Sequence, residues 1–186
     1  MKPCLVVVDL LRDTFDMHPD SFIVKSARAF IPRLNALIDA FHKKAFPVIF
    51  ACDSFLPEDF IFKGKMEPHS LRGTPGESVI DELNRNPEDH VLFKRRFSAF
   101  FKTDLDQTLR TFGVDMVLVT GISTQVCVLT TALDAICHDF RTVIVEDCCT
   151  AQRPQDHKAA LDLYRRTALY PLLQVMNSEQ CLEMLV

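Results

Sequence analysis

Short apolar runs alternate with longer segments of helical periodicity along this chain. The runs are rich in β-branched residues, which favours buried strands. We expect strands at Cys4–Asp9, Val48–Asp53, His90–Phe93, Met116–Thr120, Thr142–Glu146 and Leu172–Val175. We expect helices at Val24–Lys44, Ser78–Leu83, Asp104–Phe112, Thr124–Phe140, Pro154–Tyr170 and Glu179–Leu185. Such alternation predicts an α/β fold, in which helices cover both faces of a parallel sheet.

The chain length and the absence of internal boundaries favour one domain over residues 1–186. A chain of 186 residues suits a single large core, and no repeat or low-complexity stretch divides it. The first predicted helix carries one apolar face, which would pack on the sheet. That face consists of Ala27, Phe30, Ile31, Leu34, Leu37, Ile38 and Phe41.

Composition and charge exclude several classes of partner. The formal net charge of −4 and the pI of about 5.8 argue against nucleic acid. No apolar run is long enough to cross a bilayer, and the first is too short for a signal peptide. The seven cysteines show no metal-binding spacing, and their odd number leaves at least one unpaired. We therefore expect a cytoplasmic protein with free thiols and no membrane partner.

Cys127 follows a predicted strand at the start of a predicted helix. Gly121 ends the strand, and Ser123 or Thr124 can cap the helix, placing Cys127 in its first turn. Free N–H groups there stabilise an anion, which predicts a lowered thiol pKa and a site for an oxyanion. The alternative is a small buried thiol without chemistry.

Two charged residues stand at equivalent positions on other strands. Asp9 ends the first predicted strand and Lys94 follows the third. Carboxyl ends of parallel strands converge in a doubly wound sheet, so both side chains are expected near Cys127. The carboxylate would take the thiol proton and the ammonium would stabilise the charges. Alone, Asp9 reads equally well as a capping residue and Lys94 as a surface lysine.

These residues lie in segments that resemble the isochorismatase-like cysteine hydrolases, a family that includes nicotinamidases and N-carbamoylsarcosine amidases. The resemblance spans nearly the whole chain. It is carried by Val6–Phe15 (VVVDLLRDTF), His69–Gly76 (HSLRGTPG), Lys94–Phe100 (KRRFSAF) and Gly121–Cys127 (GISTQVC).

The resemblance implies a three-layer αβα sandwich around a six-stranded parallel sheet. It makes Asp9 the general base, Lys94 its partner and Cys127 the nucleophile. The N–H groups of Ser123 and Cys127 would form the oxyanion hole, helped by a cis peptide between Ile122 and Ser123. A cysteine at this position implies amide cleavage through a thioester, whereas true isochorismatases lack it. The family also implies a homodimer or homotetramer.

The metal site of nicotinamidases is incomplete in this chain. Asp53 and His69 match ligand positions of that branch, but Phe55 replaces a histidine between them. Two ligands rarely hold a catalytic ion, so we expect no metal and no other cofactor. Asp53 and His69 are then hydrogen-bonding residues of the loop that follows the second strand.

Several residues are candidates for binding a small amide or carbamoyl substrate. Residues 54–76 form a long connection at the carboxyl edge of the sheet, where ligands bind in open α/β folds. The candidates are Phe15, Phe55, Phe60, His69 and Arg153, the last as a carboxylate clamp, with Arg95 and Arg96 as weaker candidates for that role.

The sequence therefore predicts a metal-independent cysteine hydrolase that cleaves a C–N bond of a small amide, ureido or carbamoyl compound. Two alternatives remain open at this stage. One is a nicotinamidase-like enzyme, and the other is a binding protein in which the same site is catalytically idle.

Overall fold

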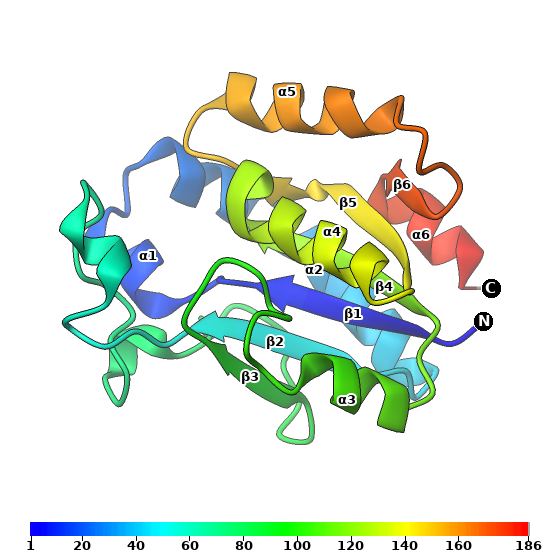
Figure 1. Ribbon diagram of the computed structural model, residues 1–186, viewed down its shortest axis with the longest axis horizontal. Helices are drawn as coiled ribbons and strands as arrows, with labels where there is room; N and C mark the ends of the chain where they lie inside the picture. The colour runs from blue at the N-terminus through cyan, green and yellow to red at the C-terminus, as the bar shows by residue number, and fades with distance from the viewer. Residues whose placement is uncertain (186) are drawn as a thin grey trace.

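The computed structural model describes residues 1–185 and contains one sheet of six parallel strands (Figure 1). The strand order is β3-β2-β1-β4-β5-β6. The strands are β1 (Pro3–Val8), β2 (Val48–Asp53), β3 (His90–Lys94), β4 (Met116–Ile122), β5 (Arg141–Thr150) and β6 (Leu173–Met176). The expected six-stranded parallel sheet is confirmed, and β5 continues four residues past its predicted end at Glu146.

Within residues 1–185, six α-helices and three shorter helical turns lie between and after the strands. The α-helices are α1 (Arg12–Met17), α2 (Phe22–Lys43), α3 (Leu105–Thr111), α4 (Leu129–Cys137), α5 (Pro154–Arg165) and α6 (Ser178–Met184). The turns are the 3₁₀ helices η1 (Phe60–Lys63) and η2 (Pro75–Glu77) and the π-helical η3 (Thr124–Val128). None of the helices in residues 1–185 has the length and apolar character that crossing a bilayer requires.

The helix predicted at Ser78–Leu83 is wrong. Val79 forms an antiparallel bridge with Leu11, and the Ile80 N–H donates to the Leu10 carbonyl at 3.1 Å. Both apolar side chains are buried in this extended pairing. Pairing with the chain that follows β1 therefore satisfies the backbone and outweighs the local helical pattern.

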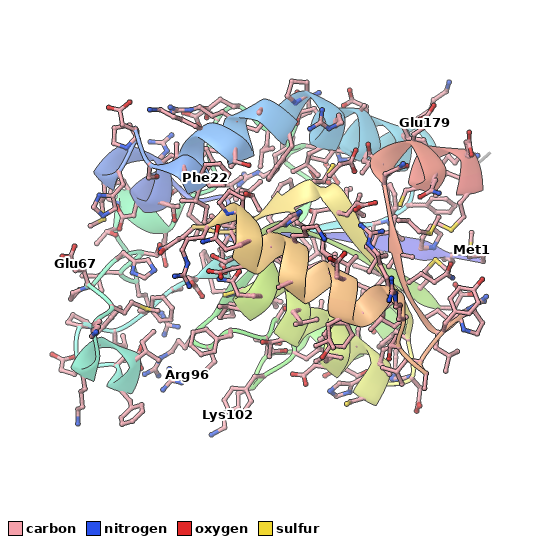
Figure 2. All side chains as sticks on the ribbon, turned by 90° about the horizontal axis from the view of Figure 1, so that it is seen from above. Met1, Phe22, Glu67, Arg96, Lys102 and Glu179 are labelled. Carbon is pink, nitrogen blue, oxygen red and sulfur yellow. The ribbon has the colours of Figure 1, made fainter. Side chains whose placement is uncertain are left out.

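Alternating residues of the strands pack into two hydrophobic cores, one on each face of the sheet. Leu5 and Val7 pack with α2 and α6, whereas Val6 and Val8 pack with α3, α4 and α5. Seen from above, α2 and α6 lie on one side of the sheet and α4 and α5 on the other (Figure 2). The strand period of two thus produces three layers.

The strand order reverses between β1 and β4. The chain moves outward from β1 to β3, crosses back, and continues outward from β4 to β6. A crevice at the carboxyl ends of β1 and β4 is where such sheets bind ligands. Gly121 makes the two strands approach closely there, because a Cβ at this position would meet the Val8 carbonyl oxygen at 2.0 Å.

Candidate active site

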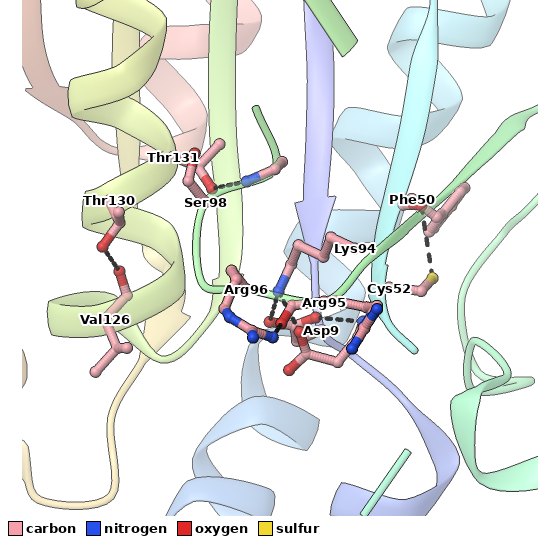
Figure 3. A network of polar contacts seen from close by, with 12 residues as sticks. Asp9, Phe50, Cys52, Lys94, Arg95, Arg96, Ser98, Val126, Thr130 and Thr131 are labelled. Carbon is pink, nitrogen blue, oxygen red and sulfur yellow. Dashed lines mark hydrogen bonds and ion pairs between the residues drawn. The ribbon is translucent and has the colours of Figure 1, made fainter. Parts of the chain in front are cut away.

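Lys94 joins two carboxylates at the carboxyl edge of the sheet. Its Nζ lies 2.8 Å from Oδ2 of Asp9 and 2.5 Å from Oδ1 of Asp53. The ends of β1, β2 and β3 supply these three residues, and Figure 3 shows Lys94 extending toward Asp9. The Lys94 side chain is fully buried, so all of its charge is balanced by protein groups. The predicted pairing of Asp9 with Lys94 is present in the geometry, together with a second carboxylate.

The backbone turns sharply at Asp9 to present its carboxylate. Asp9 has φ of +55°, in the left-handed region that few residues other than glycine adopt. Its Oδ1 accepts a hydrogen bond from the Asp53 N–H at 2.9 Å. The main chain of β2 and the ammonium of Lys94 therefore each bind one oxygen of the Asp9 carboxylate. Left-handed residues of this kind concentrate at functional sites.

Cys127 lies in η3, directly after β4. The peptide bond between Ile122 and Ser123 is cis, as the sequence predicted. Neither Ser123 nor Thr124 makes the expected side-chain cap. Instead, the N–H groups of Val126 and of Val128 both donate to the Ser123 carbonyl, at 3.0 and 3.3 Å. Turns of this width frequently occur at functional sites.

Two N–H groups of this segment lie beside the thiol, those of Ser123 and of Cys127 itself. Among the hydrogen bonds of residues 1–185 that lie outside regular elements, none uses the N–H of Ser123. Both residues line the same cavity. This arrangement provides two donors beside the thiol, as an oxyanion hole requires.

The Cys127 thiol lies close to both carboxylates. One ligand atom each from Asp9, Asp53 and Cys127 fall within 4.8 Å of one another. Burial raises the pKa of the Cys127 thiol well above its usual value, and the negative charges of Asp9 and Asp53 raise it further, whereas Lys94 acts in the opposite direction. The lowered pKa predicted from the helix start is therefore wrong. Desolvation and two carboxylates outweigh the turn and the ammonium.

The neighbouring groups share this electrostatic environment. Burial opposes the charge of Lys94, but Asp9, Cys127 and Asp53 together raise its pKa well above the usual value. Burial and the nearby Asp9 raise the pKa of Asp53 to about 7, although Lys94 opposes this shift. At neutral pH the site thus holds a permanent ammonium and a protonated thiol that faces an acceptor.

We expect the alkylation of Cys127 by iodoacetamide to accelerate continuously as the pH rises from 6 to 10. A raised pKa leaves little thiolate at neutral pH, and the thiolate is the reactive form. The exposed Cys137 is an internal control, and peptide mass spectrometry separates the two. A rate for Cys127 that is already constant near pH 7, while that of Cys137 still rises, would contradict the assignment.

A cavity of about 720 Å³ opens above these groups. Asp9, Asp53 and Cys127 are exposed to it, and Phe55 and His69 form part of its wall. The full lining comprises Asp9, Asp13, Thr14, Met17, His18, Ser21, Phe22, Ile23, Asp53, Phe55, Lys65, Met66, Glu67, His69, Phe97, Ile122, Ser123, Gln125, Val126, Cys127 and Gln152. Residues 54–76 supply one wall, as predicted for this connection, and lie beyond the strand arrowheads in Figure 1.

Ion pairs between the buried Asp59 and two partly exposed arginines fix that wall to the sheet. Asp59 accepts hydrogen bonds from Arg95, at 2.5 Å, and from Arg96, at 3.2 Å. The hydrogen bond from Arg95 holds the pKa of Asp59 well below its usual range. Arg95 and Arg96 were candidates for binding a substrate carboxylate. The structure shows that both guanidinium groups pair with Asp59 instead, and neither lines the cavity.

Three other candidates for substrate binding do not reach the cavity. Phe15 is buried in the core beside α2, and Phe60 is 72% exposed at the start of η1. Arg153 pairs with Asp156 at 2.8 Å on the exposed side of α5. Arg153 therefore does not line the cavity in this structure, because the first turn of α5 provides a nearer carboxylate, and the carboxylate clamp stays a prediction. Gln152, one residue earlier, lines the cavity in its place.

Sequence reasoning missed two contributions to the site. Asp53 was expected to serve the loop, yet it shares Lys94 with Asp9. Its position at the end of an apolar strand, like that of Asp9, was a usable signal. The helix α1 was also missed, and it supplies Asp13, Thr14 and Met17 to the cavity. Six residues with a single apolar one buried carry no helical periodicity to detect.

This chain is similar in sequence and structure to several known proteins. The structure resembles N-carbamoylsarcosine amidase from Thermoplasma acidophilum, with 31% identity, a TM-score of 0.83 and coverage of 96% of this chain and 98% of that one. The chain is 27% identical to a probable inactive nicotinamidase from Arabidopsis thaliana, over 94% of each protein. It is 37% identical to ureidoacrylate amidohydrolase from Pantoea ananatis over 92 residues, which are 50% of this chain and 34% of that protein.

A domain-wide match agrees with these pairwise similarities. The family model of the isochorismatase domain matches residues 3–180. This span includes the strand ends that hold Asp9, Asp53 and Lys94, and the turn that holds Cys127. The chain therefore belongs to the isochorismatase family.

Proposed function

We propose that this protein is a cysteine amidohydrolase that cleaves a C–N bond of a small amide, ureido or carbamoyl compound through a thioester. The observation that carries the proposal is the meeting of Asp9 and Cys127 on the floor of one cavity, with the buried Lys94 paired to Asp9. Non-peptide C–N hydrolysis is the activity named for its amidase and ureidoacrylate amidohydrolase relatives.

The first half of the reaction uses the carboxylate as a base. The substrate carbonyl oxygen accepts hydrogen bonds from the N–H groups of Ser123 and Cys127. Asp9 takes the Cys127 proton while the sulfur forms a bond to the carbonyl carbon. Because the thiol pKa is raised, proton transfer and attack are coupled, and no free thiolate waits in the resting site. Lys94 remains charged and offsets the negative charge that moves onto sulfur and oxygen.

The second half returns the proton and releases the acyl group. Asp9 donates its proton to the leaving nitrogen as the C–N bond breaks, so the amine leaves neutral and a thioester remains on Cys127. Asp9 then takes a proton from water, whose oxygen attacks the thioester carbonyl. Collapse of the second tetrahedral intermediate releases the acid and restores the thiol. In each half of the reaction Asp9 therefore takes up one proton and gives one back, first to the leaving nitrogen and then to the Cys127 sulfur.

The cavity favours a small, polar substrate. A volume of about 720 Å³ suits a small molecule. Gln125 and Gln152 supply amide groups to its wall, and Lys65 is the one lysine or arginine among the lining residues between 1 and 185. A substrate carboxylate would therefore find its cation at Lys65.

We also propose that the reaction needs no metal ion. Phe55 occupies the position of a possible histidine ligand, and its ring packs edge-on against His69 with 5.4 Å between ring centroids. Nδ1 of His69 is hydrogen-bonded to the Glu67 carbonyl at 2.8 Å. Oδ1 of Asp53 accepts a hydrogen bond from the Lys94 ammonium. The two remaining candidate ligands therefore already have protein partners.

A screen for ammonia release tests the proposal. We expect turnover of at least one compound from a set of small amides, ureido acids and carbamoyl amino acids, each paired with a neutral analogue and including nicotinamide. Dialysis against a chelator should leave at least about 80% of the activity, since Phe55 offers no ligand atom at the position where a histidine would complete the metal site. The chelated Cys127→Ala protein is the control for background release.

Two outcomes of this screen would contradict the proposal. Activity that disappears on chelation and returns with zinc, iron or manganese would overturn metal independence. Binding of the amides without any release of ammonia, measured by calorimetry on the same samples, would instead identify a catalytically idle site.

A further inference from the structure

A hydrogen bond joins the segment that carries Cys127 to a helix 33 residues later. Oγ1 of Thr124, the first residue of η3, lies 2.8 Å from Nδ1 of His157 in α5. Thr124 is 1% exposed and His157 is half-buried. Within residues 1–185 this is the one hydrogen bond between η3 and α5. Neither residue lines the cavity, so neither is positioned to touch a substrate.

The position of Thr124 makes this bond relevant to the reaction. Thr124 follows Ser123, whose N–H is proposed for the oxyanion hole, and precedes Cys127 by three residues. The turn between them is wide: the Ser123 carbonyl accepts hydrogen bonds from the N–H groups of Val126 and Val128, and the Thr124 carbonyl accepts one from Leu129. A wide turn of this kind gains rigidity from an external partner at its first residue.

His157 is fixed in place on its own side. The backbone N–H of His157 donates to the Arg153 carbonyl at 3.4 Å, within the first turn of α5. Burial lowers the pKa of His157, while Glu146 of β5 acts in the opposite direction and Arg165 of α5 acts with burial. Glu146 and Arg165 are themselves paired, with Nη1 and Oε1 3.4 Å apart. The lowered pKa favours the neutral imidazole, whose Nδ1 faces the Thr124 hydroxyl.

We propose that His157 is a positioning residue, which holds η3 through Thr124 so that the Cys127 sulfur and the two oxyanion donors keep their relative geometry. This proposal rests on the proposed function. It assigns a role in the reaction to α5, a helix that supplies no group to the cavity. Misplacement by a fraction of an ångström lowers turnover more than binding, because attack depends on alignment of the reacting atoms.

The test compares variants that remove the hydrogen bond with variants that keep it. His157→Phe and Thr124→Val preserve shape and lose the bond, whereas His157→Asn retains a polar atom at the place of Nδ1 and Thr124→Ser retains the hydroxyl. We expect the first pair to lower kcat roughly tenfold with KM changed less than about twofold. The second pair should retain most of the activity. The double variant His157→Phe with Thr124→Val should lose no more than either single variant.

Hydrogen exchange provides a measurement that does not need turnover. Amides of residues 123–128 should exchange several-fold faster in His157→Phe and Thr124→Val than in the wild type, His157→Asn or Thr124→Ser. Lys158→Ala, an exposed neighbour on α5, is the matched control and should leave this peptide unchanged.

The outcomes separate this proposal from the proposed function. Unchanged exchange in residues 123–128, additive losses in the double variant, or equal losses in His157→Asn and His157→Phe would each overturn the positioning role. Faster exchange in a protein that hydrolyses no amide would uphold the contact between α5 and η3 and reject the amidohydrolase function. A fall in melting temperature with kcat unchanged would make His157 a structural residue only.

Discussion

Replacing Lys94 with Met should lower the free energy of unfolding by about 3–5 kcal/mol at pH 7. Lys94 is the cation between Asp9 and Asp53, and its removal leaves two buried carboxylates without a balancing charge. Chemical denaturation monitored by circular dichroism measures the loss. Lys43→Met, at an exposed position on α2, is the control and should change the stability by less than about 0.5 kcal/mol.

The loss should depend on pH with a definite sign. Without the ammonium, Asp53 ionises less readily in the folded protein, so its pKa, already raised to about 7, lies further above the unfolded value. The folded variant then binds more protons than the unfolded chain. Its loss of unfolding free energy relative to the wild type therefore shrinks as the pH falls from 7 to 4. Adding Asp53→Asn to Lys94→Met should restore part of the stability, because one buried charge disappears. A deficit below about 1 kcal/mol, or one that is the same at pH 4 and pH 7, would contradict this account.

Replacing Cys127 with Ala should lower kcat at least about a thousandfold on any substrate that the screen identifies. The sulfur forms the bond to the acyl carbon, and Cys127 is the one cysteine that lines the cavity among residues 1–185. The fold should survive, because Cys127 is a small side chain that pairs in no disulfide. The melting temperature is the check on folding.

Asp9 and Cys127 should act as one unit. Asp9→Asn keeps the size of the side chain and removes the base, so it should also lower kcat severely. The double variant Asp9→Asn with Cys127→Ala should be only slightly slower than Cys127→Ala alone, because either change stops the same proton transfer. Losses in kcat/KM that multiply fully would show that the two residues serve separate steps.

The sheet was predictable because buried parallel strands carry their signal locally. Runs such as Val48–Asp53 are apolar on both faces, and the structure reproduces their bounds. The helix expected at Ser78–Leu83 failed for the opposite reason, since Val79 finds its partner in Leu11, far away in the sequence. Hydrophobic periodicity reports on one segment alone, so it does not predict pairing between segments that are distant in the sequence.

The reactive groups were predictable in position but not in protonation. Asp9, Lys94 and Cys127 stand at strand ends, and a doubly wound sheet brings strand ends together. The thiol pKa depends instead on the depth of burial and on a second carboxylate, Asp53. The placement of Arg153 depends in the same way on Asp156, which pairs with its guanidinium within one helical turn. Both cases concern neighbouring residues that are brought together only when the chain folds.

The acyl adduct on Cys127 is the most direct test of the central claim. The protein should be mixed with an identified substrate and quenched in acid within the first turnover. Its mass is then measured by mass spectrometry of the intact protein. We expect a mass increase equal to the acyl portion of the substrate, mapped by peptide fragmentation to Cys127 and absent from Cys127→Ala. It should also accumulate in any variant that slows hydrolysis of the thioester more than its formation. A wild-type protein that turns over this substrate in repeated quenches without any adduct, or with one on a residue other than Cys127, would contradict the account.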